Sequence, residues 1–194
     1  MSHRFWKFDP ANAGRLVSSA RADVHPPEHV LSLLDPRRGH IVADVGCGPG
    51  YFTIPIAERV QPAGRVAALD IAPEMLSRLR VRATAAGVRN VALVQSEESR
   101  LPLAAAAYDR ILLAFLMHEL EAPDDVLRDV REALRPGGLG VVIDWMPRET
   151  PAGPPLEVRV PAERVRERLE TVGLAPQAPV DLGPHSYAVV FRRP

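Results

Sequence analysis

One glycine-rich stretch constrains the fold of this 194-residue chain more than any other feature. Residues 41–57 read IVADVGCGPGYFTIPIA. They begin as a short apolar run, pass through an acidic residue and a turn with three glycines, and end in a pattern suited to a helix. A buried parallel strand is continuously apolar because helices cover both of its faces. The stretch therefore predicts a strand, a turn and a helix of an α/β fold.

The spacing of the glycines favours a ligand site at this turn. Glycine lets the backbone approach a ligand closely, and the first turn of the next helix offers unpaired N–H groups. Gly46, Gly48 and Gly50 give the pattern G-x-G-x-G. Dinucleotide-binding folds instead use G-x-G-x-x-G. A tight turn without a ligand is the alternative interpretation.

With Asp44 placed before the glycines, the segment DVGCGPG resembles motif I of the class I S-adenosylmethionine (SAM)-dependent methyltransferases. The resemblance extends over about residues 30–191, with its motifs in order. It implies a doubly wound, Rossmann-like α/β fold with a seven-stranded, mostly parallel sheet. The last strand is expected to be antiparallel and to lie between the fifth and the sixth. It also implies S-adenosyl-L-methionine as cofactor and S-adenosyl-L-homocysteine as product, with Asp44 orienting the turn and the glycines facing the methionine part.

Composition is consistent with one globular unit and bounds its surroundings. The chain is 46% hydrophobic with a formal net charge of +0, so no basic nucleic-acid footprint is expected. Cys47 is the only cysteine, which excludes a multi-cysteine metal site, and we expect it to pack rather than react. With no leader and no apolar run near ~20 residues, a cytoplasmic protein away from membranes is expected. We divide the unit into a lid with a first helix, residues 1–36, and a SAM-binding domain, residues 37–194.

A second acidic residue follows the next predicted strand, residues 65–69. Asp70 lies 20 positions after Gly50, where a carboxylate accepts hydrogen bonds from ribose hydroxyls. NAD and SAM folds share this spacing, so it does not separate them. The alternative is that Asp70 only caps the following helix.

The resemblance also implies which residues contact the adenine ring. The segment DIAPEML after the second strand resembles the family's adenine-contacting segment, with Ile71 and Met75 as apolar contacts, although Met75 also suits a core position. After a third predicted strand, laying L-P-L on the family's L-P-F assigns the adenine-binding acid to Glu97. Glu98 is its rival, and two solvated glutamates are the alternative interpretation.

The segment FLMHEL, residues 115–120, follows a predicted fourth strand at 108–114. Ligands of open parallel sheets bind outside the carboxyl ends of the strands. We therefore expect Phe115 beside the cofactor and His118 beside the methyl acceptor, where its pKa suits a general base. A structural hydrogen bond of His118 is the equal alternative. Trp145, at the end of a predicted fifth strand at residues 141–145, is a candidate for a wall of the substrate pocket.

Two segments without clear periodicity are candidates for covering the site. An aromatic cluster near the N-terminus, Phe5, Trp6 and Phe8, predicts that this segment packs against the rest of the chain. It covers either the edge of the sheet or the cofactor and acceptor. The proline-rich residues 148–160 read as an ordered loop at the strand ends and as a candidate for acceptor selectivity.

These observations predict an enzyme that transfers a methyl group from SAM to a small-molecule acceptor. We expect no metal, no nucleic-acid partner and a monomer or homodimer. A non-catalytic SAM-binding module is one alternative. An NAD(P)-dependent oxidoreductase is less favoured, since Lys7 is the only lysine and no Tyr-x-x-x-Lys pair exists.

Overall fold

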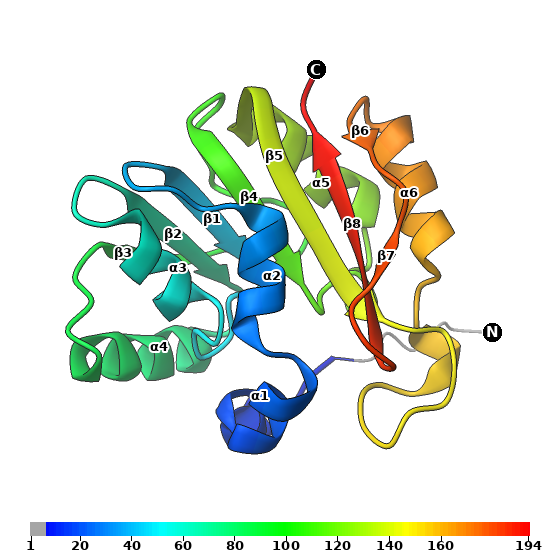
Figure 1. Ribbon diagram of the computed structural model, residues 1–194, viewed down its shortest axis with the longest axis horizontal. Coiled ribbons are helices and arrows are strands. Elements are labelled where there is room, and N and C mark those ends of the chain that lie inside the picture. Colours follow the sequence, from blue (N-terminus) through cyan, green and yellow to red (C-terminus); the bar gives the residue numbers. More distant parts are fainter. Residues whose placement is uncertain (1–6) are drawn as a thin grey trace.

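A twisted central sheet forms the frame of the molecule (Figure 1). The computed structural model describes residues 7–194. Its strands are β1 Ile41–Val45, β2 Arg65–Asp70, β3 Val91–Gln95, β4 Tyr108–Ala114, β5 Leu134–Trp145, β6 Ala175–Pro176, β7 Val180–Asp181 and β8 Ser186–Arg192. Their order is β3-β2-β1-β4-β5-β8-β6, with β7 also pairing with β8. The first five strands are mutually parallel and β8 is antiparallel to β5, which confirms the doubly wound, mostly parallel sheet.

Helices cover both faces of this sheet (Figure 1). One face carries α2 Pro27–Leu34, α3 Thr53–Val60 and α4 Pro73–Ala85, whose Leu31, Ile56 and Leu79 join one buried cluster. The other face carries α5 Pro123–Ala133 and α6 Ala162–Thr171, whose apolar side chains join a second cluster. The strands between them alternate between the two clusters, which explains their continuous apolar runs.

The sheet has eight strands where seven were expected, because the sixth is broken in two. The short strands β6 and β7 both pair with β8. Pro176 and Pro179 lie in or between them, and proline has no N–H to donate to a ladder. Gln177 keeps the chain close by donating its backbone N–H to Val190 O at 2.8 Å. β8 lies between β5 and these pieces, as the resemblance implied.

The segment LRPGG, residues 134–138, forms the start of β5. Tyr108 pairs with Leu134, but Arg110 pairs with Leu139, so the register shifts between these two pairs. The extra residues bulge out of the ladder, and Gly137 adopts a φ of 74° there.

The chain before α2 folds at the end of the sheet toward which β1, β4 and β5 point (Figure 1). It forms the 3-10 helix η1 Pro10–Val17 and the short helix α1 Ser19–Val24, neither of which the sequence predicted. The loop after β5, with its 3-10 turn η2 Leu156–Val158, lies at the same end (Figure 1). Phe5 and Trp6 lie outside the described residues. Within residues 7–194, no helix is long and apolar enough to cross a membrane.

The packing of Gly50 generates the first prediction. Its φ is 85°, and a Cβ at this position would lie 2.2 Å from Cδ1 of the fully buried Leu79. Gly50→Ala should therefore destabilise the protein through both backbone strain and overpacking. Gly87→Ala is the matched control, because its φ is 70° but a Cβ would meet nothing within 4 Å.

Urea unfolding of both variants measures the difference. We expect Gly87→Ala to lower the free energy of unfolding by about 1–2 kcal/mol and Gly50→Ala by about 1–3 kcal/mol more. Equal losses would show that Leu79 moves aside without cost and that the contact does not hold the turn.

Candidate functional site

A cavity of about 970 Å³ opens at the carboxyl ends of β1, β2 and β4. Most of its lining comes from the turns that follow β1, β2, β3 and β4, from the N-terminal segment between residues 7 and 25, and from the loop after β5. We call residues 7–25 the lid. Most of the residues singled out from the sequence line this cavity, namely Asp44, Gly46, Gly48, Asp70, Ile71, Met75, Glu97, Glu98, Phe115 and His118.

Gly50 is the predicted site residue that does not line the cavity. Gly46 and Gly48 have φ values of 70° and 52° and present their backbone to it. Gly50 lies behind the turn, against Leu79 of α4. Its position explains the third glycine of the motif by helix packing rather than by approach to a ligand.

Two buried carboxylates hold the glycine turn. Asp44 accepts a hydrogen bond of 2.5 Å from the hydroxyl of Thr53, the first residue of α3, and burial raises its pKa to about 7. Asp70 accepts from Gly48 N–H at 2.8 Å through Oδ2 and from Ala72 N–H at 2.9 Å through Oδ1. Burial raises the pKa of Asp70, although these backbone donors favour its charged form. Asp70 therefore connects two neighbouring turns of the cavity.

The residues expected beside adenine occupy one wall. Ile71 is 44% exposed and offers an apolar surface to the cavity, whereas Met75 is only 5% exposed and shares in the core. The Glu98 carboxylate forms an ion pair with Lys7 of the lid. The Glu97 carboxylate has no hydrogen bond or ion pair to residues 7–194. Of the two rivals, Glu97 thus has the carboxylate available for a ligand.

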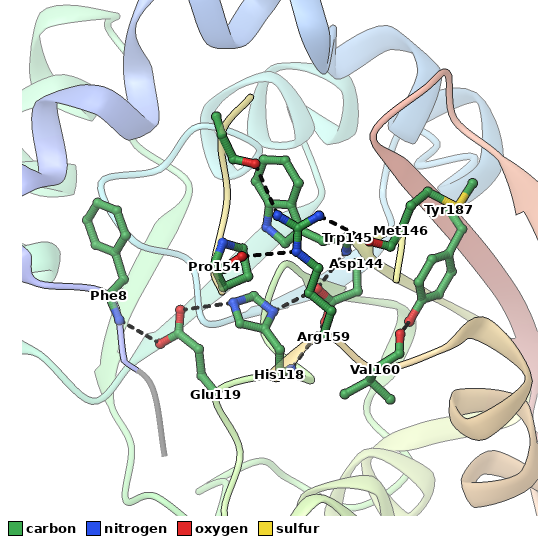
Figure 2. A network of polar contacts seen from close by, with 11 residues as sticks. Phe8, His118, Glu119, Asp144, Trp145, Met146, Pro154, Arg159, Val160 and Tyr187 are labelled. Atoms are coloured by element: carbon green, nitrogen blue, oxygen red, sulfur yellow. Dashed lines mark hydrogen bonds and ion pairs between the residues drawn. The ribbon is translucent and has the colours of Figure 1, made fainter. Parts of the chain in front are cut away.

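His118 lies between two carboxylates (Figure 2). Its Nδ1 is 2.7 Å from Oδ1 of Asp144, a fully buried residue of β5, and its backbone N–H donates to Oδ2 of the same residue at 3.2 Å. Nε2 faces Oε1 of Glu119 at 3.6 Å. Burial disfavours the imidazolium, but Asp144 and Glu119 outweigh it and the pKa of His118 is raised. Glu119 also accepts the backbone N–H of Phe8 at 3.3 Å, which links the lid to this network.

The lid supplies site residues that the sequence analysis did not single out. The hydroxyl of Tyr51 donates to the backbone carbonyl of His25 at 2.8 Å and so joins the glycine turn to the lid. The His25 ring lies 4.8 Å from the Phe115 ring and 5.2 Å from the Trp145 ring. The guanidinium of Arg21 lies over Tyr51 and Phe115. The sequence of the lid has no hydrophobic periodicity that predicts these positions. The spacing of one helical turn between Arg21 and His25 is the only local feature that relates them.

His25 is held in its neutral form. The Ser186 hydroxyl donates to Leu182 O at 3.2 Å, so its oxygen accepts from Nδ1–H of His25, also at 3.2 Å. Nε2 of His25 is buried without a hydrogen-bond partner among residues 7–194. Burial, together with the positive charge of Arg21, lowers the pKa of His25 to about 4.

The loop after β5 is fixed by one buried arginine. Arg159 donates to the carbonyls of Met146, Arg148, Ala152 and Pro154, and its guanidinium lies 5.6 Å from the Trp145 ring (Figure 2). The loop is therefore ordered, as its prolines indicated, and its residues 151–154 line the cavity. Trp145 lies between this loop and His25, in the position of a pocket wall.

Metal-binding and reactive-thiol sites find no support in the described part of the chain. Residues 7–194 contain no group of three or more side chains that could hold a metal ion. Cys47 is buried, and burial raises the pKa of its thiol, in keeping with a packing role.

Comparison with known proteins gives a consistent picture. Residues 42–138 match the model of a methyltransferase domain family. Demethylmenaquinone methyltransferases from Listeria monocytogenes and Geobacillus stearothermophilus are 30% and 28% identical over 128 and 144 residues. These matches cover 66% and 73% of this chain but only 54% and 62% of the relatives' own length.

Solved structures extend the likeness over nearly the whole chain. A SAM dependent methyltransferase from Aquifex aeolicus is 30% identical, with a TM-score of 0.92 over 97% of this chain and 100% of that chain. The cyclase SpnF has a TM-score of 0.75 over 98% of this chain and 86% of its own, at 18% identity. This second likeness shows the fold alone.

The pKa values of two histidines of the cavity, His25 and His118, are predicted to be shifted in opposite directions from the usual value. NMR titration should place the midpoint of His25 at about 4 and that of His118 above 6.5. Asp144→Asn should lower the His118 midpoint and leave that of His25 in place. A common midpoint for both would contradict the described environments.

The two histidines should therefore make contributions of opposite sign to the pH dependence of the free energy of unfolding. Between pH 6.5 and about 4, the unfolded chain binds a proton at residue 25 that the folded chain does not, so His25 makes folding less favourable as pH falls. The contribution of His118 is fully present below pH 6.5 and is lost as pH rises through its raised folded pKa. Urea unfolding of His25→Phe and His118→Gln, measured from about pH 4 to above the raised pKa of His118, separates the two contributions.

Proposed function

The chain belongs to the SAM-dependent methyltransferase family, whose cofactor is S-adenosylmethionine, and we propose that it methylates a small-molecule acceptor in the cavity described above. One observation carries the proposal. The same cavity is lined by the turns that match the family's cofactor motifs and by the aromatic wall beyond β4 and β5. Its volume of about 970 Å³ lies near the upper end of the roughly 300–1,000 Å³ of small-molecule sites. Such a space suits a cofactor and an acceptor together.

The residues present fit this cofactor. Gly46 and Gly48 at positive φ offer backbone for the methionine part, and Asp44 orients their turn. Each oxygen of Asp70 already accepts one backbone N–H and retains a lone pair for a ribose hydroxyl. Ile71 and Met75 offer apolar surface to adenine, and Glu97 offers a carboxylate to its amino group. When bound, SAM supplies an electrophilic methyl group on its sulfonium.

The acceptor side of the cavity is aromatic. His25, Phe115 and Trp145 pack against one another there, and Tyr51 lies near Arg21. These flat side chains favour a planar, unsaturated acceptor. The named substrate of the curated relatives, demethylmenaquinone, is a compound of this kind. We therefore propose an aromatic or quinol-like ring as acceptor.

The protein's contribution is placement and shelter. A reacting pair held in line in a site that excludes water gains most of its rate from orientation. The lid is tied to the body by Phe8 with Glu119, by Lys7 with Glu98 and by Tyr51 with His25. We propose that this lid, within residues 1–36, covers the site on the domain of residues 37–194.

Partners and location complete the proposal. We propose that the protein acts without nucleic acid, in keeping with its formal net charge of +0, and that it works in the cytoplasm as a monomer or homodimer. Light scattering of the purified protein determines its oligomeric state.

Asp70→Ala tests the cofactor assignment. Losing a charge-assisted acceptor and the support of the glycine turn should weaken S-adenosylhomocysteine binding by roughly 2 kcal/mol or more in calorimetry. Asp109→Ala is the matched control, because Asp109 also accepts a backbone N–H, from Ile41 at 2.8 Å, but lies outside the cavity lining. Unchanged affinity of Asp70→Ala would overturn the site map.

His118→Asn separates a proton-accepting role from a structural one. If His118 removes a proton from the acceptor, its variant should lose roughly 10²–10⁴-fold in kcat while binding S-adenosylhomocysteine normally. In the wild type, kcat should then rise with pH through the raised pKa of His118. Loss of cofactor affinity in parallel with kcat would instead assign His118 to holding the turn after β4.

A further inference from the structure

Arg21 is a buried cation of the cavity to which the proposed methyl transfer gives no role. It lies on α1 and lines the cavity. Its guanidinium carbon is 5.0 Å from the centre of the Tyr51 ring and 4.8 Å from that of Phe115. These residues follow β1 and β4, so Arg21 lies between the glycine turn and the acceptor wall.

The guanidinium has no anionic partner in the described chain. It forms no hydrogen bond or ion pair with residues 7–194, and its Nε is buried. Burial lowers the pKa of Arg21 to about 10, with no carboxylate opposing it. Two other arginines near the cavity differ from Arg21. Arg15 also lines the cavity but is exposed, and Arg159, beside the Trp145 wall, donates to four carbonyls.

The faces of two aromatic rings attract a guanidinium, but they offer no acceptor to the N–H groups that point outward in its plane. A desolvated cation without an acceptor is costly, and a planar fork matches two oxygens of a carboxylate. The rings hold Arg21 in a fixed position that leaves this edge for a ligand.

We propose that Arg21 is a carboxylate-binding residue of the cavity, receiving an anionic oxygen pair of a ligand between Tyr51 and Phe115. The inference rests on the proposed function, which puts two ligands in this cavity. The carboxylate has two possible sources, the methionine part of the cofactor and the acceptor. Both are reachable from a position between the glycine turn and the aromatic wall.

Calorimetry with a matched pair of ligands tests the first source. S-adenosylhomocysteine carries the amino-acid carboxylate, whereas 5′-methylthioadenosine keeps the nucleoside and the thioether without it. Arg21→Met should weaken S-adenosylhomocysteine binding roughly 10- to 100-fold and leave 5′-methylthioadenosine unchanged. Arg21→Lys should lose less, because it keeps the charge without the fork.

Benzoate and benzamide test the second source. If the acceptor provides the carboxylate, Arg21→Met should bind S-adenosylhomocysteine normally. Benzoate should then stabilise the wild type against heat more than benzamide does, with or without the nucleoside, and Arg21→Met should abolish that preference.

A second arginine controls for a general effect of losing a buried cation. Arg131 also has a buried Nε without a hydrogen-bond partner in residues 7–194, but it lies outside the cavity lining, so Arg131→Met should change neither ligand preference. The inference is overturned if Arg21→Met leaves both preferences intact, or if it weakens S-adenosylhomocysteine and 5′-methylthioadenosine equally. If the wild type binds neither nucleoside, the proposed function is overturned instead. The comparison of benzoate with benzamide then tests the carboxylate-binding role of Arg21 by itself.

Discussion

The carboxylate of Asp70 connects the two turns on which the cavity depends. Its oxygens accept the N–H of Gly48, in the turn after β1, and of Ala72, in the turn after β2. The parallel ladder brings these turns together, since Val45 pairs with Leu69 and Cys47 N–H extends the pairing to Leu69 O at 2.8 Å. Asp70 is 9% exposed, so these bonds form in a setting of low polarity where they are strong. The glycine turn is thereby shaped before a ligand arrives.

The sequence predicted the parts of the site that the sheet itself positions. Asp44, Asp70, Phe115 and His118 each follow or end a strand, and parallel strands bring such residues to one edge whatever the rest of the chain does. The spacing of the motif predicts that glycine is required at position 50, but it does not indicate the reason. The structure shows that the reason is contact with Leu79 rather than with a ligand.

The lid and the loop after β5 could not be predicted in the same way. Arg21 and His25 reach the cavity through tertiary contacts with Tyr51, Phe115 and Trp145, and no local periodicity specifies such contacts. Arg159 likewise orders its loop through carbonyls rather than through a sequence pattern.

The cavity combines two contrasting electrostatic environments. His25 is neutral, next to the cation of Arg21 and among aromatic rings, whereas His118 lies between Asp144 and Glu119, which favour its charged form. The surroundings of His25 are thus cationic and aromatic, whereas His118 is bordered by carboxylates.

A crystal structure of the protein with S-adenosylhomocysteine tests the central claim most directly. The account predicts the adenine against Ile71 and Glu97, the ribose hydroxyls on Asp70, and the sulfur directed toward the wall formed by Phe115 and Trp145, with space left beside it for an acceptor. A nucleoside bound outside this cavity, or bound with its sulfur directed away from that wall, would contradict it.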